Sequence, residues 1–370
     1  MKNVSVIIML LLFQTGFAQD YYLLAGTYTK TNSKGIYVYT FDSKTGIAKP
    51  VSNIFTDNPS YLAIDQDGKH VYAVNEMGGG KGAVSSFSFD KKNGTLHFIN
   101  NELTNGDDPC FIDLDATGKW IAAANYSGGN FTVFPVKSDG SVGAAAQTIQ
   151  HTGSSVNKDR QEKPHVHSTV FSTDNRFLVV VDLGMDKITV YPFDASKEKP
   201  VTDEPVELNT PAGSGPRHIL LNPSKPFAYL ISELSGNITV YDYGGDKIDS
   251  IQTISSYPAD VTGEKGSAAI HFSPDGKFLY ASNREGSNTI SIFSVDEATG
   301  KLTSLGFSST GGDQPRDFTI DPTGNFLLAG NVKSDNIIIF NRDIKTGLLK
   351  NSGKKITIPQ PTRLLFTHIK

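Results

Sequence analysis

Cysteine is almost absent from this sequence of 370 residues, in which Cys110 is the only one. A single cysteine excludes a disulfide within the chain, and no cysteine stands near the N-terminus where a lipid could be attached. Three signatures of catalysis or nucleotide binding are also missing: the Gly-x-Ser-x-Gly elbow, the P-loop and the dinucleotide fingerprint. The chemistry of the protein must therefore be sought in another pattern.

An excess of positive charge is lacking as well. Lys and Arg total 34 against 38 Asp and Glu, which gives a formal net charge of −4. A protein that binds a polyanion needs a basic surface, so this balance argues against nucleic acid as a partner. The chain also has no amphipathic helical pattern, heptad repeat or low-complexity tract.

The one long apolar run lies at the N-terminus. Residues 1–3 include a lysine, residues 4–13 are almost wholly apolar, and Gly16, Phe17 and Ala18 follow. This order indicates a secretory signal peptide cleaved after Ala18, whereas the alternative interpretation is a buried first strand. The run is too short to span a bilayer. We therefore expect residues 1–18 to be a signal peptide and residues 19–370 to form one domain, exported to the periplasm, with no membrane span.

Residues 58–75 organise the rest of the chain. They predict a strand, a tight Asp-Gly turn and a second strand that ends on a polar residue. The pattern returns in residues 108–125, 166–182, 215–232, 267–283 and 314–331. The last residues of the six units are spaced by 50, 57, 50, 51 and 48 positions. A period near fifty in an all-β pattern is typical of a β-propeller, in which each repeat forms one four-stranded blade.

The two ends of the chain complete a seventh unit. Residues 21–46 contain the later strands of a blade without its first strand, and residues 360–368 resemble that missing strand. Pairing between them would close the ring and remove both open edges. We therefore predict an all-β protein, a seven-bladed β-propeller closed by pairing of the C-terminal strand with the N-terminal blade. We expect it to be a monomer.

Two positions of the repeat vary strongly in residue type. The start of the first strand and the end of the second lie at the same end of an antiparallel pair, so both can border the central channel. At the first position the units carry Ser60, Cys110, His167, Arg217, Ala268, Arg316 and Thr362. Just past the second strand they carry Thr27, Glu76, Tyr126, Leu183, Glu233, Arg284 and Val332. One channel mouth is thus predicted to collect a histidine, three arginines, two glutamates and a tyrosine.

Further polar residues are expected near this mouth. They comprise two flanking histidines and a collar at the ends of the second strands: His165, His218, Asn75, Asn125, Asp182 and Asn283. Asn and Asp at a strand end often only cap a turn, which is the alternative for the collar. The unit of His167 also spans 18 positions from Pro164 to Asp182, where Pro109 to Asn125 spans 16. We expect this insertion to bulge the strand and re-aim an imidazole.

The predicted cluster suits hydrolysis of an ester or lactone. Arginines present planar forks that bind carboxylate or phosphate, and a histidine near a glutamate takes a proton from water near neutral pH. An arginine can also stabilise the oxyanion that forms when water attacks a carbonyl. A metal bound by His165, His167 and His218 is disfavoured because the arginines repel a cation, so we expect no metal and no cofactor. Cys110 is positioned as a nucleophile could be, although buried cysteines are commonly inert.

Eight short motifs follow one another along nearly the whole mature chain: residues 58–60, 73–76, 164–168, 182–184, 215–218, 232–234, 273–284 and 314–316. In this order they resemble the seven-bladed propeller lactonase family. That family includes the propeller type of 6-phosphogluconolactonase and the fungal carboxy-muconate lactonising enzyme. The resemblance implies a lactone hydrolase or, in the muconate branch, an enzyme that closes a lactone.

The resemblance also implies roles for individual residues. His167, or in its place His165, would be the general base, Glu233 would orient it or share its proton, and Arg217 and Arg284 would hold the substrate anion and the oxyanion. The expected substrate-binding residues are His165, Arg316, Glu76, Asn283, Asn125, Tyr126, His218 and Asp182.

The partner implied by the resemblance is a small lactone or sugar acid. A phosphorylated sugar lactone is a cytosolic intermediate, so an exported relative could act on an unphosphorylated one. The alternatives are a cycloisomerase that uses the same site, and a propeller that binds a ligand without catalysis.

Overall fold

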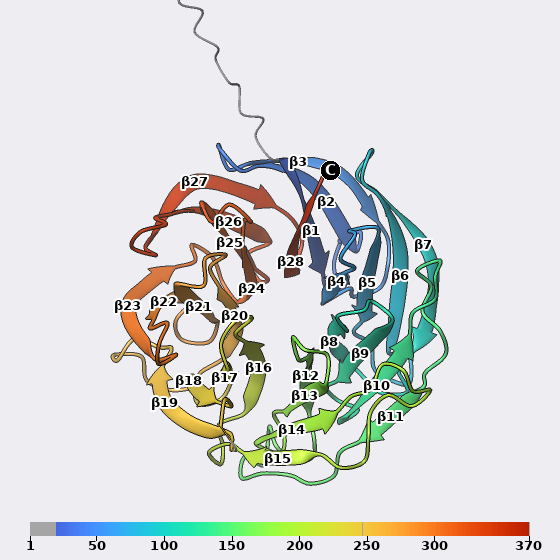
Figure 1. Cartoon of the computed structure of the whole chain (residues 1–370). Coiled ribbons are helices and arrows are strands. Elements are labelled where there is room, and N and C mark those ends of the chain that lie inside the picture. The colour runs from blue at the N-terminus through green and yellow to red at the C-terminus, as the bar shows by residue number, and fades with distance from the viewer. Residues whose placement is uncertain (1–19, 246, 370) are drawn as a thin grey trace, which may run out of the picture.

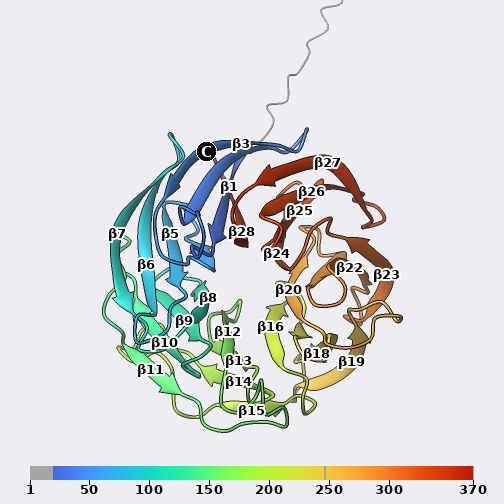
Figure 2. The same ribbon diagram turned by 180° about the vertical axis from the view of Figure 1, so that it is seen from behind.

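The computed structural model describes residues 20–245 and 247–369. Within these residues the chain forms 28 strands and no helix, and the strands make seven antiparallel four-stranded sheets. The sheets stand around a central axis as the blades of a propeller (Figures 1 and 2). The predicted all-β, seven-bladed propeller is therefore confirmed. The predicted signal peptide at residues 1–18 lies outside the described residues.

The first four blades run from the N-terminal strands to the middle of the chain. Blade 1 contains β28 (Pro361–His368), β1 (Asp20–Thr27), β2 (Ile36–Asp42) and β3 (Ile47–Ile54). Blade 2 contains β4 (Leu62–Ile64), β5 (His70–Asn75), β6 (Ala83–Asp90) and β7 (Thr95–Leu103). Blade 3 contains β8 (Pro109–Leu114), β9 (Trp120–Asn125), β10 (Asn130–Pro135) and β11 (Gln147–Gln150). Blade 4 contains β12 (Val166–Phe171), β13 (Phe177–Asp182), β14 (Lys187–Pro192) and β15 (Val206–Asn209).

The remaining three blades complete the ring, and in every blade the first strand named here lies nearest the central channel (Figure 1). Blade 5 contains β16 (Pro216–Leu221), β17 (Phe227–Ser232), β18 (Asn237–Asp242) and β19 (Asp249–Ser255). Blade 6 contains β20 (Ser267–Phe272), β21 (Phe278–Asn283), β22 (Thr289–Val295) and β23 (Leu302–Ser309). Blade 7 contains β24 (Pro315–Ile320), β25 (Phe326–Asn331), β26 (Asn336–Arg342) and β27 (Leu349–Thr357).

The ring closes where the two ends of the chain meet in blade 1. Strand β28 pairs antiparallel with β1, from Tyr21 opposite His368 to Thr27 opposite Pro361. The C-terminal strand therefore takes the innermost place that the N-terminal strands leave empty, as predicted. Closure in this way leaves the first blade with the same four strands as the others and removes a free inner edge.

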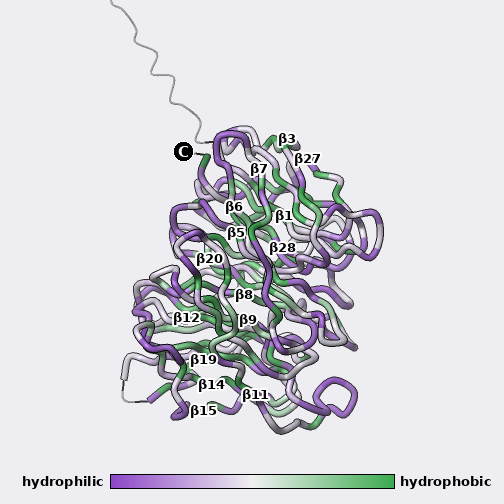
Figure 3. The backbone as a smooth tube through the Cα atoms, turned by 90° about the vertical axis from the view of Figure 1, so that its right-hand side faces the viewer, coloured by the Kyte–Doolittle hydropathy of each residue, from purple (hydrophilic) through white to green (hydrophobic). Residues whose placement is uncertain are grey.

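The hydrophobic core lies between neighbouring blades, where aromatic residues of a second strand meet the glycine turn of the next blade. Tyr229 donates a hydrogen bond from its hydroxyl to the Gly300 carbonyl at 2.8 Å. Gly300 has φ +68°, and a Cβ there would lie 2.5 Å from the Phe227 ring, so glycine is required at this turn. The side view shows apolar stretches running through the interior, near β8, β9 and β12, and hydrophilic stretches at the periphery (Figure 3). Each buried aromatic or aliphatic side chain stabilises this packing by about 1.5–3 kcal/mol.

A β-bulge recurs near the start of the inner strands. The register shifts between Pro109 and Phe111, between Val166 and Ser168, between Pro216 and His218, and between Pro315 and Asp317. The residues skipped by the ladder at these four bulges are Cys110, His167, Arg217 and Arg316. A bulge changes the direction of the extra side chain. The propeller thus presents its most variable position at the mouth of the channel.

The expected cause of the bulge at His167 is wrong. Val166 pairs with Asp182 as Pro109 pairs with Asn125, so the strand from Val166 onward has the same length as its equivalent. The two extra residues precede β12 and lie in its approach from the preceding loop. The bulge at His167 belongs to the common blade geometry, since it occurs equally in blades without the insertion.

Candidate active site

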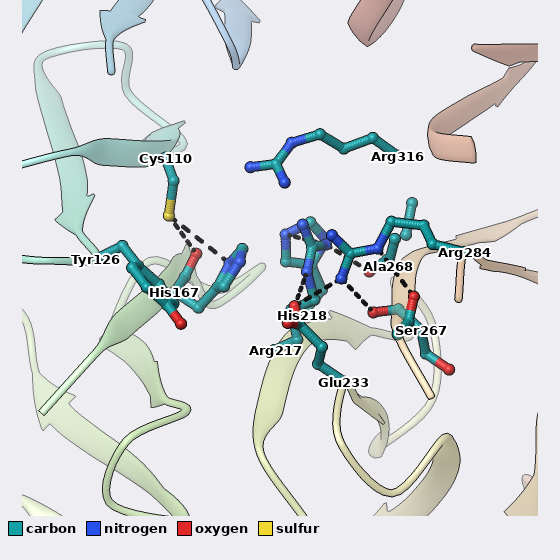
Figure 4. A network of polar contacts seen from close by, with 12 residues as sticks. Cys110, Tyr126, His167, Arg217, His218, Glu233, Ser267, Ala268, Arg284 and Arg316 are labelled. Carbon is teal, nitrogen blue, oxygen red and sulfur yellow. Dashed lines mark hydrogen bonds and ion pairs between the residues drawn. The ribbon is translucent and has the colours of Figure 1, made fainter. Parts of the chain in front are cut away.

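Two rows of residues meet at the channel mouth. One row consists of the bulge residues, and the other follows the second strand of each blade. In every blade a backbone hydrogen bond links the residue after the second strand to the residue two positions before the first row: for example, Glu233 N–H donates to Gly215 O at 2.6 Å and Tyr126 N–H donates to Asp108 O at 3.0 Å. Figure 4 shows Cys110, Tyr126 and His167 on one side of a central space, with Glu233, Arg284 and Arg316 around the other. The predicted convergence at one mouth is therefore observed.

The acceptor residues of these hydrogen bonds have an unusual backbone. Five of them have positive φ and stand directly before a proline: Asn58, Asp108, Gly215, Gln314 and Gln360, with φ between 40° and 63°. Left-handed φ is costly for residues other than glycine, and least so for Asn and Asp. The turn points the carbonyl at the second strand while proline begins the inner strand. The backbone is thus strained at the turns that place the residues of the site.

Glu233 is the electrostatic centre of the mouth. Its carboxylate lies 3.0 Å from Arg217 Nε, 2.9 Å from Arg284 Nη2 and 2.6 Å from Arg160 Nη2. Burial alone would raise the pKa of Glu233, but Arg284 and Arg217 outweigh it and hold the pKa well below its usual value. Burial and the neighbouring arginines lower the pKa of Arg217 to about 10, so both partners stay charged at neutral pH. Glu233 is a fixed counter-ion that holds three guanidinium groups in place.

His167 faces the same space from blade 4. Its Nδ1 lies 3.7 Å from Cys110 Sγ, and the sulfur lies 3.5 Å from the His167 carbonyl oxygen. The ring packs edge-to-face against Tyr126, with centroids 5.5 Å apart. Burial, followed by the charge of Arg217, lowers the pKa of His167 well below 6.5. The imidazole is therefore neutral at neutral pH, which is the state that accepts a proton.

Glu76, Arg316 and Tyr28 form a second polar group across the channel. Arg316 Nη2 lies 3.6 Å from Glu76 Oε2, the Tyr28 hydroxyl donates to Glu76 Oε1 at 2.9 Å, and the Arg316 guanidinium lies 5.4 Å from the Tyr28 ring centroid. Tyr28 was missed by the sequence, which placed Thr27 in this row. The structure corrects that placement, because Tyr28 N–H donates to Gln360 O at 3.1 Å as the equivalent residues do in other blades.

The two flanking histidines lie beside the cluster in different ways. His165 stacks on Tyr126 with ring centroids 4.5 Å apart, and its nitrogens lie 3.0 Å from Tyr126 O and 3.3 Å from Glu162 Oε2. His218 lies beneath, where Arg217 Nη1 is 3.1 Å from its Nε2. Burial, and then Arg217, lowers the pKa of His218 well below 6.5. Among the three histidines, His167 is the one that the bulge directs into the channel mouth.

Arg160 is a fourth arginine of the site that the repeat did not reveal. It lies in the irregular segment 151–163, and its Nη2 is 3.3 Å from the Tyr126 hydroxyl as well as 2.6 Å from Glu233 Oε1. Its side chain is 41% exposed, against 2% for Arg217 and 11% for Arg284. The segment has no equivalent in the other repeats, so no internal comparison marked this residue. Four arginines against two glutamates leave the mouth with an excess of positive charge.

Comparison with known proteins identifies the family. A family profile described as Lactonase, 7-bladed beta-propeller matches residues 22–366. The chain belongs to the seven-bladed β-propeller lactonase family. This lactonase is 36% identical over 346 residues to a 6-phosphogluconolactonase of Bacillus subtilis (strain 168), a match that covers 93% of this chain and 97% of the relative. It is 34% identical over 352 residues to a 6-phosphogluconolactonase of Formosa agariphila, covering 94% and 99%.

A solved structure agrees with these relatives. The periplasmic gluconolactonase of Pseudomonas aeruginosa has a TM-score of 0.91 against this lactonase at 37% sequence identity, and the match covers 95% of this chain and 100% of that one. Relatives that share this fold across nearly their whole length are lactone hydrolases by description. The protein is accordingly an enzyme of the lactonase type.

Three residues expected in the lactonase site are instead engaged inside the protein. Asn125, Asp182 and Asn283 are fully buried. Each is hydrogen-bonded to the residue just after the outermost strand of the preceding blade: Asn125 to Thr104, Asp182 to His151 and Asn283 to Ser256. The collar therefore ties each blade to the connection that enters it. Of the other predicted residues, His218 lies beneath the mouth, and the rest, including Glu76, Tyr126 and Arg316, border it.

A layer of side chains lies beneath the mouth. The Tyr61 and Phe111 rings stack with centroids 4.3 Å apart, Arg363 lies 4.2 Å from the Tyr61 centroid, and His218 is 5.2 Å from Phe111. A separate cavity of about 470 Å³ lies on the far side of this layer. There burial raises the pKa of Asp113 to about 6. The layer forms the floor of the candidate site.

The described part of the lactonase lacks both a membrane-spanning helix and a cluster of metal ligands. No helix in residues 20–245 and 247–369 is long and apolar enough to cross a membrane. Among the same residues, no three His, Cys, Asp or Glu side chains are grouped so as to bind a metal ion.

Proposed function

We propose that this protein hydrolyses the lactone of a sugar acid, with His167 as general base and arginines holding the developing negative charge. The observation that carries the proposal is a neutral, buried imidazole at a mouth that also holds four guanidinium groups. Such a pair of features suits attack of water on a carbonyl, because one group removes a proton and the others stabilise the oxyanion. The sugar-lactone relatives support the substrate class.

The neighbouring sulfur supports Nε2 as the basic atom of His167. A thiol has one hydrogen, and donation to the His167 carbonyl leaves the Cys110 lone pairs facing Nδ1. Nδ1 then carries the imidazole proton and Nε2 keeps its lone pair. Burial raises the pKa of the Cys110 thiol, so the sulfur stays protonated and is not a nucleophile at neutral pH.

Arg316 is the best placed group to meet the oxyanion. In the described residues, the contacts of its guanidinium are Glu76 at 3.6 Å and the Tyr28 ring, and its N–H groups make no hydrogen bond. Arg217 and Arg284, in contrast, each donate to backbone carbonyls as well as to Glu233. We therefore assign Arg316 to the oxyanion, with Arg217 and Arg284 supplying positive charge from fixed positions.

The proposed reaction is balanced in atoms and protons. Water gives a proton to His167 Nε2 while its oxygen bonds to the lactone carbonyl carbon, and the carbonyl oxygen becomes an oxyanion. The bond between that carbon and the ring oxygen then breaks, and the imidazolium returns its proton to the ring oxygen. The product is the open hydroxy acid, which ionises at neutral pH. Glu233 carries no proton in these steps, because Arg284 and Arg217 outweigh its burial and hold its pKa well below the usual value. Its part is to keep the arginines oriented.

We also propose that the protein is exported through its N-terminal segment. The pattern of residues 1–18 supports this, as does similarity to a relative described as periplasmic. Expression of the full chain, followed by fractionation and mass spectrometry of its N-terminus, tests the proposal. A cytoplasmic protein that retains Met1 would contradict it.

The function is tested by lactone hydrolysis of the purified chain in a pH-stat, corrected for spontaneous ring opening. The substrates are 6-phosphogluconolactone, gluconolactone, galactonolactone and a muconolactone, each with and without EDTA. Hydrolysis that survives EDTA and is lost in His167→Gln supports the proposal. Hydrolysis lost to EDTA would point to a metal at His165, His167 and His218. Conversion of carboxy-muconate without hydrolysis of any lactone would favour a cycloisomerase.

A further inference from the structure

We propose that Arg160 binds an anionic substituent of the substrate, so that the segment 151–163 determines selectivity for charged over neutral lactones. This inference rests on the proposed function for its substrate, but the residue's role follows from its own contacts. Nothing in the repeat pattern assigns a function to the segment. Three features of Arg160 support this role: a rigid support, an available guanidinium and a position outside the reacting centre.

The segment that carries Arg160 is anchored at both ends. His151 Nδ1 lies 2.8 Å from Asp182 Oδ2, and His151 Nε2 lies 3.1 Å from the Tyr191 hydroxyl. At the other end, the fully buried Gln161 donates from Nε2 to the Leu183 carbonyl at 2.8 Å. Asp182, which was expected to contact substrate, thus holds the base of this segment instead. These contacts hold the segment in place, so Arg160 has a fixed position at the mouth.

The Arg160 guanidinium has donors to spare. Only its Nη2 is engaged in the described residues, by Glu233 Oε1 at 2.6 Å and by the Tyr126 hydroxyl at 3.3 Å. Its Nε and Nη1 groups make no hydrogen bond there, and the side chain is the most exposed of the four arginines at the mouth. Glu233 is already neutralised by Arg217 and Arg284. Arg160 therefore shares the single negative charge of Glu233 with two other arginines, and its own positive charge is not fully compensated.

Arg160 lies on the outer side of the site. His167 and Arg217 are almost wholly buried, so a lactone carbonyl attacked at His167 lies deeper than Arg160. The part of a bound substrate that reaches Arg160 is consequently the end remote from the carbonyl. A guanidinium binds phosphate or carboxylate through two parallel N–H groups, whereas a neutral hydroxyl gains much less from it. The ligand chemistry is thus a terminal oxyanion, either phosphate or carboxylate.

The test compares Arg160→Gln and Arg160→Lys with wild type, with Lys158→Gln as a control on the same segment. Steady-state kinetics on 6-phosphogluconolactone, on glucaro-1,4-lactone, which keeps a free carboxylate, and on neutral gluconolactone separate the two anions from the neutral substrate. We expect Arg160→Gln to lower kcat/KM for at least one anionic lactone by about 10- to 100-fold, mainly through KM, and for gluconolactone by less than about 3-fold. Arg160→Lys recovers part of the loss. An equal loss on charged and neutral lactones overturns the inference.

A binding measurement keeps this inference separate from the proposed catalysis. Calorimetry of 6-phosphogluconate, glucarate and neutral sorbitol needs no turnover, so it applies even if no lactone is hydrolysed. We expect wild type and Lys158→Gln to bind one of the two acids at least about tenfold more tightly than Arg160→Gln does. Binding of both acids unchanged by Arg160→Gln, or no binding to wild type, overturns the role of Arg160. Loss of hydrolysis with binding intact would instead count against the catalytic proposal.

Discussion

Arg217 Nε lies 3.0 Å from Glu233 Oε2, and the two side chains are 2% and 8% exposed. A buried ion pair is costly to form but still more costly to break, because one partner is left charged and without compensation. Here one carboxylate faces three arginines, so the two sides of the pair are not equivalent. Loss of Glu233 leaves the positive charges of the three arginines without compensation.

Glu233→Gln is expected to destabilise the fold by about 3–5 kcal/mol, because three guanidinium groups then repel one another in a buried site. Urea unfolding measures the change. Adding Arg160→Gln to Glu233→Gln removes one of the repelling charges and should recover part of the loss. Additive effects of the two substitutions would show that the carboxylate and Arg160 are not coupled.

Cys110→Ala is expected to lower kcat more than Cys110→Ser, because alanine leaves Nδ1 of His167 without an acceptor. The effect should be about 3- to 30-fold for alanine, comparable to loss of an orienting contact rather than of the base itself. The readout is the pH dependence of kcat together with KM, since a structural effect alone would not move the acid limb of the profile. Alanine and serine variants with wild-type profiles would show that the sulfur does not position the ring.

His167→Gln is expected to reduce turnover by about 10²- to 10⁴-fold, the usual contribution of a general base. In wild type, the lowered pKa of His167 keeps the imidazole neutral, so activity should persist below pH 6.5 and fall only when His167 is protonated. The acid limb of the pH profile is obtained from rates measured between pH 4.5 and 8 and corrected for spontaneous hydrolysis. An acid limb centred above pH 6.5 would contradict the assignment.

Stability should decrease as the pH is lowered from neutral. His167 and His218 have pKa values below 6.5 in the fold, so under acid conditions the unfolded chain takes up protons that the folded chain does not. Below pH 6.5 each contributes a loss of about 1.4 kcal/mol per pH unit until its own folded pKa is reached. Denaturant unfolding from pH 7.5 to 5 measures the slope. His218→Gln should flatten it, whereas substitution of the exposed His97 should not.

Deletion of residues 361–370 is expected to prevent stable folding. The first blade would lose the innermost strand that pairs with β1 over its whole length. Circular dichroism and size-exclusion chromatography should then show an aggregating or unfolded chain. A synthetic peptide of residues 359–370 added in trans supplies the missing strand, and recovery of the native profile would attribute the defect to closure alone. A truncated chain that melts like wild type would refute this view of the ring.

Sequence reasoning reached the fold because the repeat supplies its own internal comparison. The spacing of Asn75 and its equivalents predicted the blades, and the match of the last strand to the inner strands predicted closure. The same comparison predicted that His167, Arg217 and Glu233 would meet, since antiparallel pairs place both ends of a hairpin at one face. These predictions depended on backbone geometry that each blade shares.

The residues that were missed lie where the comparison fails. Arg160 stands in a segment without equivalents, and its place at the mouth depends on the hydrogen bonds of His151 and Gln161 with distant strands. Tyr28 was displaced by one position because its partner strand comes from the other end of the chain, so no short turn fixed their register. Asn125 was read as a site residue because sequence shows a polar strand end but not the direction of its side chain.

The pairing of β1 with β28 determines when the ring can close during folding. These strands are the most distant in sequence, yet neither has its full set of neighbours until they meet. Contacts of such long range form slowly, because the whole intervening chain must be ordered first. The ring therefore cannot close until β28 has been synthesised. This delay is compatible with the export proposed above, because a chain that closes its ring last stays unfolded until the C-terminal strand is available.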